Sequence, residues 1–277
     1  MFAVSAALAL FASSVGQPAD NSPHSEGSLV PTVRQAAPGQ PFMVGIRIKL
    51  EEHWHCYWRN PGDSGLATEV VWDLPSGWQV SPMQWARPKE ILWGGFRIYG
   101  YEGEAWKFVT LVPPADAKPG SAAEIRADMR WLVCKETCIP ARQSVSYRVP
   151  IGDAAVVHEA NEELVRTWYR EVPTPDRSWS FSARRVGNNI QIRIGIPNQG
   201  QLPGGTRFLP DRGEVINHSV DQRVERSGDG WLLTVPISEF AYTPPTRARG
   251  LLMAPEGQVL PNGRQAVAFD AAILPPR

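Results

Sequence analysis

The stretch Trp131-Leu132-Val133-Cys134-Lys135-Glu136-Thr137-Cys138-Ile139-Pro140 contains two of the chain's three cysteines. A disulfide requires its two Cα atoms to lie roughly 4.4–6.8 Å apart. Residues four apart on one straight strand would be about 13 Å apart, at ~3.3 Å per residue, so the chain must turn between the cysteines. Apolar, β-prone residues flank the pair on both sides. The stretch therefore predicts a β-hairpin with Lys135-Glu136-Thr137 at its tip and the two cysteines facing each other across its base.

The chemistry of this pair points to exchange. A disulfide that closes so short a loop adds little stability through chain entropy, because that contribution grows with loop length. Thiol–disulfide exchange is therefore favoured, with a structural staple and a metal site as alternatives. Lys135, Arg130 and Arg142 would lower a cysteine pKa and Glu136 would raise it. The spacing C-x₃-C lacks the second C-x₂-C or the histidine pair of a zinc site.

The composition predicts an all-β protein. With 26 Pro, 24 Gly and 11 Trp, and one convincing helical pattern, the 277-residue chain has the signature of short strands and many turns. About seven short strands over roughly 120 residues are typical of an immunoglobulin-like sandwich. The predicted strands of this first domain, residues 28–150, are Leu29–Arg34, Phe42–Leu50, Thr68–Leu74, Trp78–Met83, Ala105–Val112, Ala123–Val133 and Gln143–Val149.

The chain after Pro150 changes character. Apolar residues recur at helical spacing through Ala154–Arg170, with Asp153 as the predicted cap and Pro173-Thr174-Pro175 as the stop. This pattern predicts a short helix that joins two immunoglobulin-like β-sandwich domains, the second within residues 151–277 and serving support or partner docking. Its predicted strands are Trp179–Arg185, Asn189–Ile196, Arg207–Leu209, Trp231–Ile237, Leu251–Ala254 and Gln265–Ile273.

The N-terminus resembles an export signal. Residues 1–16 contain a short apolar run followed by small residues, which predicts a signal peptide rather than a membrane span, since a span needs about 20 apolar residues. The basic segment of such signals is missing, because no Lys or Arg precedes Arg34. Residues 17–27 are polar and predict a disordered lead-in. The net charge is zero, so nothing favours binding to nucleic acid or to an anionic membrane.

Three motifs together carry a family resemblance. The stretch from Leu29 to Pro150 resembles the periplasmic N-terminal domain of the thiol:disulfide interchange protein DsbD family, and is most similar to its ScsB (suppressor of copper sensitivity) branch. The motifs that carry the resemblance are His55-Cys56-Tyr57-Trp58-Arg59-Asn60-Pro61-Gly62-Asp63-Ser64-Gly65, Tyr99-Gly100-Tyr101-Glu102-Gly103-Glu104 and the cysteine stretch quoted above.

The resemblance implies a periplasmic protein that passes electrons between thioredoxin-like domains and substrate proteins, without a small-molecule cofactor. Cys138 would form the mixed disulfides and Cys134 would resolve them. The relatives continue into membrane helices and a C-terminal thioredoxin domain, so either the electron donor is a membrane protein of the DsbD or ScsB type acting in trans, or this chain is a detached module. This chain has no predicted membrane span.

The resemblance also implies an aromatic cap loop over the pair. The matching segment carries Trp93, Phe96 and Tyr99, with Gly94-Gly95 as a hinge. The alternative is that these aromatic residues complete the sandwich core. The motif from Trp58 to Gly65 predicts a loop, in which Arg59 or Asp63 tunes the thiols or takes part in a hydrogen-bonded turn between two strands.

Copper handling is the main competing function. His53, His55 and Cys56 form a small ligand-type cluster, and Cys134 and Cys138 are soft donors suited to Cu(I), as are the thioethers of Met83 and Met129. The alternatives are that the two histidines are ordinary strand residues and that Cys56 is a spare thiol. A third class, a carbohydrate- or protein-binding sandwich with exposed tryptophans, would leave the paired cysteines unexplained.

Overall fold

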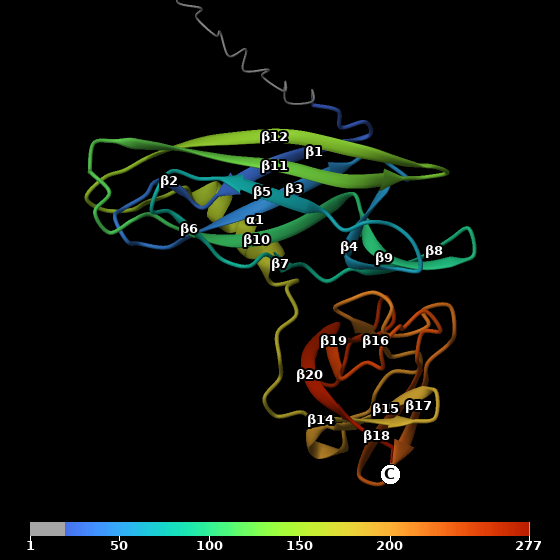
Figure 1. Ribbon diagram of the computed structural model, residues 1–277. Helices are drawn as coiled ribbons and strands as arrows, with labels where there is room; N and C mark the ends of the chain where they lie inside the picture. Colours follow the sequence, from blue (N-terminus) through green and yellow to red (C-terminus); the bar gives the residue numbers. More distant parts are fainter. Residues whose placement is uncertain (1–19, 277) are drawn as a thin grey trace, which may run out of the picture.

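The computed structural model describes residues 20–276 and consists of two β-rich domains (Figure 1). The fold is all-β apart from a single α-helix and one short 3₁₀ turn in the described residues, as predicted. The first domain contains β1 (Ser25–Pro31), β2 (Val33–Gln35), β3 (Phe42–Leu50), β4 (His55–Gly62), β5 (Glu69–Asp73), β6 (Gln79–Val80), β7 (Gln84–Trp85), β8 (Lys89–Trp93), β9 (Phe96–Glu102), β10 (Glu104–Val112), β11 (Ala122–Cys134) and β12 (Cys138–Pro150).

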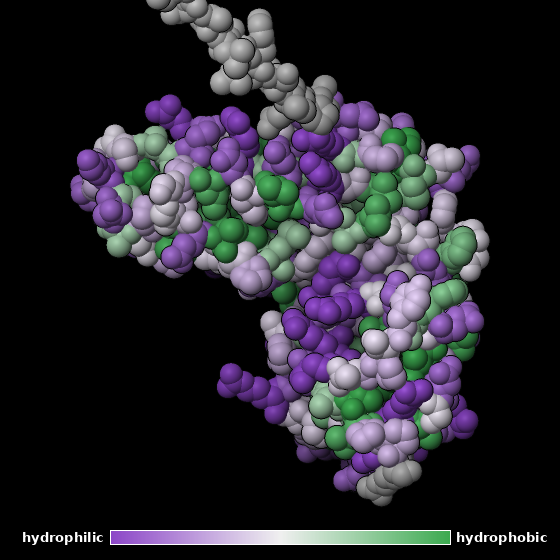
Figure 2. Space-filling view, in the orientation of Figure 1, coloured by the Kyte–Doolittle hydropathy of each residue, from purple (hydrophilic) through white to green (hydrophobic). Residues whose placement is uncertain are grey.

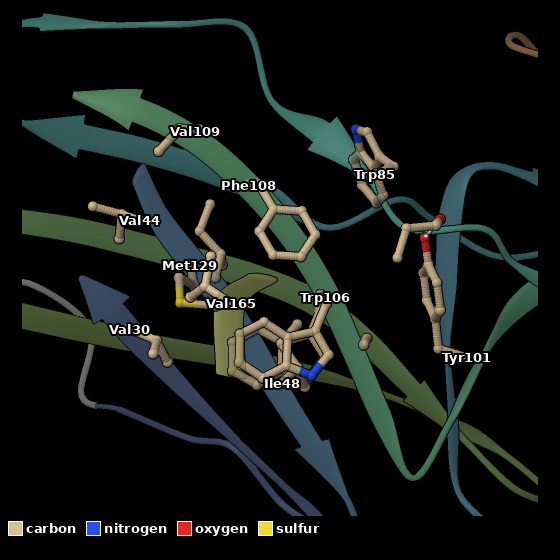
Figure 3. Close-up of a cluster of buried hydrophobic side chains, with 14 of the residues drawn as sticks. Val30, Val44, Ile48, Trp85, Tyr101, Trp106, Phe108, Val109, Met129 and Val165 are labelled. Carbon is tan, nitrogen blue, oxygen red and sulfur yellow. Dashed lines mark hydrogen bonds between the residues drawn. The ribbon is translucent and has the colours of Figure 1, made fainter. Parts of the chain in front are cut away.

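Two sheets face each other in the first domain. One has the order β1-β3-β10-β6, with β7 also on β10, and the other has the order β12-β11-β4-β9-β8, with β5 on β11. Alternate residues of β3 point into the space between them, so Phe42, Val44, Ile46 and Ile48 are buried. Figure 3 shows the hydrophobic cluster, in which Trp106 and Phe108 of β10 lie on the other face of this sheet, the face of Arg47 and Gly45. The β3 prediction is confirmed to the residue.

The helix is shorter than predicted and belongs to the first domain. After β13 (Val156–Val157), which pairs with β2, α1 runs over Glu159–Tyr169 with His158 as its N-cap instead of Asp153. Its buried Val165 packs where Gly45 leaves room, because a Cβ on Gly45 would lie 3.1 Å from Val165. Trp168 stacks on Trp106 at 5.8 Å. Residues 170–179, and not the helix, connect the domains (Figure 1).

The second domain is one curled sheet of seven strands. Its order is β16-β19-β20-β14-β15-β18-β17, with β14 and β20 parallel, and the sheet wraps around its own apolar cluster. The strand β17 was not predicted. The elements are β14 (Ser180–Val186), β15 (Asn189–Gly195), the 3₁₀ turn η1 (Pro197–Gln199), β16 (Arg207–Pro210), β17 (Arg223–Ser227), β18 (Gly230–Pro236), β19 (Arg247–Met253) and β20 (Ala266–Leu274).

Two predictions about loops are wrong. The motif from Trp58 to Gly65, predicted as a loop, mostly continues β4, which pairs with β9 and touches β11. Residues 20–27, predicted as part of a disordered lead-in, are ordered: Asn21 bridges to Arg142, and β1 begins at Ser25. The predicted signal peptide, residues 1–16, and residues 17–19 lie outside the described part of the chain.

Hydrogen bonds and ion pairs connect the two domains at their interface. Asn60 Nδ2 of β4 donates to a carbonyl oxygen of the second domain at 2.8 Å. Arg97 of β9 donates to the carbonyl oxygen of His218 at 2.7 Å, and Glu90 of β8 pairs with Arg207 at 3.3 Å. Figure 2 shows hydrophilic side chains gathered where the two lobes meet. Apolar residues of the second domain that join the core cluster of the first are Leu209, Leu251, Met253 and Ala266.

Candidate functional site

The cysteine hairpin has the predicted form. β11 and β12 pair so that Cys134 lies opposite Cys138, with the Cα atoms 4.2 Å apart and a disulfide between the side chains. The tip is Lys135-Glu136-Thr137, all three residues are exposed, and Lys135 N–H donates to the carbonyl oxygen of Thr137 at 3.3 Å. The chain therefore turns between the two cysteines, as their spacing in the sequence requires.

The disulfide lies on the outer face of its sheet. Side chains alternate along β11, so Trp131 and Val133 point into the core while Leu132 and Cys134 point to the other face. A small second cluster forms there around the buried sulfur. Its members are Tyr57, Ile98 and Cys134, with Ile91, Trp93 and Leu132 packed against them.

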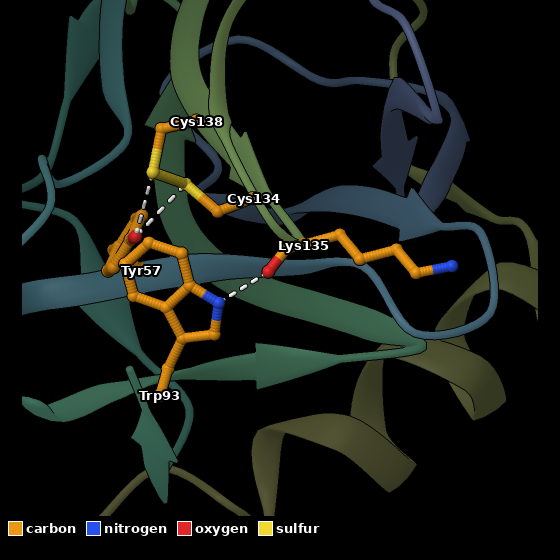
Figure 4. The surroundings of a disulfide bond; sticks show 5 residues. All are labelled: Tyr57, Trp93, Cys134, Lys135 and Cys138. Atoms are coloured by element: carbon orange, nitrogen blue, oxygen red, sulfur yellow. Dashed lines mark hydrogen bonds between the residues drawn. A yellow bond between two sulfur atoms is a disulfide. The ribbon is translucent and has the colours of Figure 1, made fainter. Parts of the chain in front are cut away.

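Tyr57 is the polar neighbour of the pair that sequence reasoning missed. Its hydroxyl donates to Cys134 Sγ at 3.0 Å and lies 3.4 Å from Cys138 Sγ (Figure 4). Burial, and secondarily Cys56, raises the pKa of Tyr57 to about 12, so the hydroxyl remains a donor. The alternation of β4 contained the signal, because a strand that sends Cys56 into the core sends Tyr57 to the opposite face.

The two sulfur atoms differ in access to solvent. Cys134 is fully buried beneath Tyr57, whereas Cys138 is exposed at the start of β12. A thiolate in solution can therefore approach Cys138 and not Cys134, which makes the pair chemically asymmetric.

The predicted cap residues occupy three different settings. Trp93, at the end of β8, donates its indole N–H to the Lys135 carbonyl oxygen and so ties the neighbouring hairpin to the cysteine tip (Figure 4). Phe96 begins β9 and is 46% exposed. Tyr99 is fully buried, and its hydroxyl lies 3.1 Å from His218 Nδ1 of the second domain, so it faces away from the disulfide cluster.

The predicted hinge is a tight turn. Gly94 and Gly95 have φ values of 56° and 86° and connect β8 directly to β9, with Trp93 opposite Phe96. Two consecutive residues at positive φ are typical of the two-residue turn that closes an antiparallel hairpin. The cap segment is thus a β-hairpin beside the disulfide and not an irregular loop.

The residues predicted to tune the thiols divide into two groups. Lys135 and Glu136 lie at the exposed tip, next to the pair. Arg59 instead pairs with Asp211 and stacks on Trp58, with the guanidinium carbon 4.7 Å from the ring centroid. Asp63 accepts hydrogen bonds from Arg97 N–H at 2.8 Å and from the second domain. Arg59 and Asp63 therefore hold the domain interface and do not adjoin the sulfur atoms.

The structure does not assemble the copper ligands. Cys56 is buried in the main core, on the opposite face of β4 from the disulfide, and burial raises the pKa of its thiol. His53 is exposed in the turn before β4. His55 is buried, with its ring 5.4 Å from that of Tyr57, and burial lowers its pKa against the opposing effect of Glu102.

The thioethers do not complete such a site either. Met129 is fully buried in the main core, and Met83 packs at the edge of the same cluster. Within residues 20–276, no group of three or more His, Cys, Asp and Glu side chains is arranged to hold a metal ion. The three thiols do not come together in one site, because alternation along β4 separates Cys56 from the other two cysteines.

Comparison with known proteins supports the fold and the family. Residues 28–149 match the family model for the N-terminal part of the thiol:disulfide interchange protein DsbD. The N-terminal periplasmic domain of ScsB from Proteus mirabilis is similar over 91% of this chain and 94% of that chain, with 16% identity and a TM-score of 0.61. This likeness shows that the fold extends over both domains.

A second solved structure is much less similar. The major pilin subunit BcpA of Bacillus cereus aligns over 77% of this chain and 67% of that chain, with 10% identity and a TM-score of 0.28, and supports no inference. No curated protein sequence matches the chain. In the described part of the chain, no helix has the length and apolar character that a membrane crossing requires. Residues 28–149 belong to the DsbD N-terminal family of thiol–disulfide exchange domains, and the chain as a whole has the fold of the ScsB N-terminal domain.

Proposed function

We propose that this chain is a periplasmic thiol–disulfide exchange protein that passes electrons between thioredoxin-like proteins and substrate proteins through Cys134 and Cys138. One observation carries the proposal: the disulfide exposes Cys138 and buries Cys134 against a hydroxyl donor. A purely structural disulfide has no need for such asymmetry, whereas exchange needs one sulfur atom open to attack and one that leaves as a stabilised thiolate.

The two half-reactions follow from this geometry. In the first, a thiolate of a reduced donor attacks Cys138 Sγ, the bond to Cys134 breaks, and Cys134 leaves as a thiolate that accepts the Tyr57 hydrogen bond. A second thiol of the donor then displaces Cys138, so that two electrons have moved to the pair and the donor carries the disulfide. In the second half-reaction, the Cys138 thiolate attacks a substrate disulfide and Cys134 resolves the mixed disulfide.

The neighbouring hairpin supports selective exchange. Trp93 packs against the Cys134 cluster and is tied to Lys135, and Phe96 stands at the end of the same hairpin. These aromatic side chains shield the buried sulfur from small thiols while Cys138 stays open. Lys135 and Glu136 flank the reacting atoms with opposite charges, so each modifies the rate in a direction opposite to the other.

The partners follow from the family. Exchange domains of the DsbD N-terminal family imply thioredoxin-like proteins as partners, and the likeness to a periplasmic ScsB domain supports the periplasm as the location. A membrane protein of the DsbD or ScsB type would be the electron donor.

A redox titration tests the proposal. The purified chain is equilibrated in glutathione and dithiothreitol buffers, its free thiols are alkylated, and the products are weighed by mass spectrometry. We expect one reversible two-electron couple in the wild type and in Cys56→Ala, and none in Cys134→Ala or Cys138→Ala. Cys134→Ala should also trap a mixed disulfide at Cys138 with an oxidised thioredoxin-like protein. A pair that resists every buffer, or trapping at Cys56, would contradict the proposal.

A further inference from the structure

The outer edge of β12 is only partly paired. β12 ends the order of its sheet, so among residues 20–276 no strand neighbours its outer side. The N-terminal segment covers part of this side: Asn21 N–H donates to the Arg142 carbonyl oxygen at 2.9 Å, and Arg142 N–H donates back at 2.6 Å. Ser144 N–H donates to Asp20 Oδ1 at 2.9 Å. The backbone groups of Arg142 and Ser144 therefore point away from β11.

The same register places the backbone of Cys138 on the open side. Backbone N–H and C=O groups alternate in direction along a strand, so Cys138 and Pro140 share the outward direction of Arg142. The Cα separation of 4.2 Å between Cys134 and Cys138 agrees, because pairs without mutual hydrogen bonds are the close ones, at about 4.5 Å. Cys138 thus offers one N–H and one C=O outward, and Pro140 offers a C=O alone.

The described part of the N-terminal segment, which begins at Asp20, does not reach these groups. After Asn21 the chain turns, with Ser25 N–H donating to the Ser22 carbonyl oxygen, and enters β1, which pairs with β3 of the other sheet. Cys138 and Pro140 are both exposed. One donor and two acceptors are therefore open to a partner immediately beside the reactive sulfur.

We propose that the β12 edge at Cys138–Pro140 is a docking strand for an extended segment of a protein partner, which pairs antiparallel and places its cysteine opposite Cys138. This inference rests on the proposed function. The mutual pair at Cys138 supplies two hydrogen bonds, and the partner residue two positions before its cysteine donates a third to Pro140. A mutually bonded antiparallel pair holds its Cα atoms about 5.5 Å apart, within the range of a disulfide.

The chemical step in this docked arrangement is balanced. The partner thiolate attacks Cys138 Sγ, a new S–S bond forms, the Cys134–Cys138 bond breaks, and its electron pair stays on Cys134. The docking strand forms hydrogen bonds with the backbone of the partner and not with its side chains. It therefore accepts extended segments of many sequences and favours polypeptides over small thiols. Pro140 lacks an N–H, which limits how far a second strand can extend along the edge.

Two N-methylated peptides test the inference on the intact oxidised chain. Both are extended peptides with one central cysteine. The first is N-methylated at the cysteine and two residues before it, which removes the two N–H groups that would reach Cys138 and Pro140. The matched control is N-methylated at the residues directly before and after the cysteine, whose N–H groups point away. The initial rate of exchange between each peptide and the oxidised chain is measured. This rate is divided by the rate at which the same peptide reacts with a small aromatic disulfide, which corrects for differences in thiol reactivity between the peptides.

We expect the first peptide to react roughly 10-fold more slowly than the control, since each hydrogen bond contributes a factor of about three to five. The control should react at a rate close to that of the unmethylated peptide. Equal corrected rates for the two methylated peptides would overturn the docking strand while leaving exchange intact. Absence of exchange with every peptide and with glutathione would instead overturn the proposed function.

Discussion

Replacing Tyr57 by Phe tests the role of the hydroxyl that lies beside both sulfur atoms of the disulfide. The ring remains to fill the cluster, while the hydrogen bond of 3.0 Å to Cys134 Sγ is lost. A hydrogen bond to a charged group contributes about 1.5–3 kcal/mol. If about half of that contribution is already present in the transition state, as Brønsted coefficients of 0.4–0.5 indicate, the barrier rises by about 0.7–1.5 kcal/mol. We therefore expect Tyr57→Phe to slow the attack on Cys138 about 3–12-fold.

The assay is stopped-flow reduction of the oxidised chain by dithiothreitol at pH 7, followed by alkylation and mass analysis. Tyr101→Phe is the matched control, because the Tyr101 hydroxyl is also buried but donates to the Ala86 carbonyl oxygen at 2.7 Å. The control should lose stability and keep its exchange rate. A folded Tyr57→Phe variant that reacts as fast as the wild type would show that the hydroxyl does not stabilise the leaving thiolate.

Three further substitutions test the surroundings by urea unfolding. Gly65→Ala would place a Cβ 2.2 Å from the Tyr57 ring, so we expect the free energy of unfolding to fall by about 3 kcal/mol. The control Gly95→Ala, whose Cβ meets nothing within 4 Å, should lose about 1 kcal/mol. Equal losses in the two variants would contradict the contact between Gly65 and Tyr57. Asn60→Ala removes buried hydrogen bonds to the second domain and should cost about 2–3 kcal/mol and speed proteolysis between the domains; unchanged proteolysis would argue against this role. Burial lowers the pKa of Lys107 from 10.5 to about 8, so the unfolded chain holds more protons between these values. Wild-type stability should therefore rise with pH through that window relative to Lys107→Met, and parallel profiles would refute the assignment.

Local geometry explains what the sequence predicted well. The spacing of Cys134 and Cys138 requires a turn whatever surrounds it, and the hairpin is confirmed. Strict alternation over Phe42–Leu50 needs only one buried face to specify a strand, and β3 has those bounds. Both inferences depend on neighbours in the sequence, which is why they hold.

Partners distant in the sequence explain the errors. The Asn60-Pro61-Gly62 sequence has the composition of a turn, but it forms the end of β4, where Gly62 pairs with Ile98 of β9 and Asn60 donates hydrogen bonds to the second domain. Val156 and Val157 fit a helical pattern, yet they form the short strand β13, which pairs with β2. Arg59 finds its carboxylate partner in the second domain, at Asp211, which no local pattern reveals.

The shared core changes what counts as one module. Leu209, Leu251 and Met253 lie beyond the family-matched residues 28–149, yet they pack into the hydrophobic cluster of that segment. A graft of residues 28–149 alone onto another protein would carry an uncovered apolar patch and the unpaired interface groups of β4 and β9. The smallest transplantable piece with a closed surface is therefore the two-domain unit, and the boundary of sequence similarity does not mark a boundary of packing.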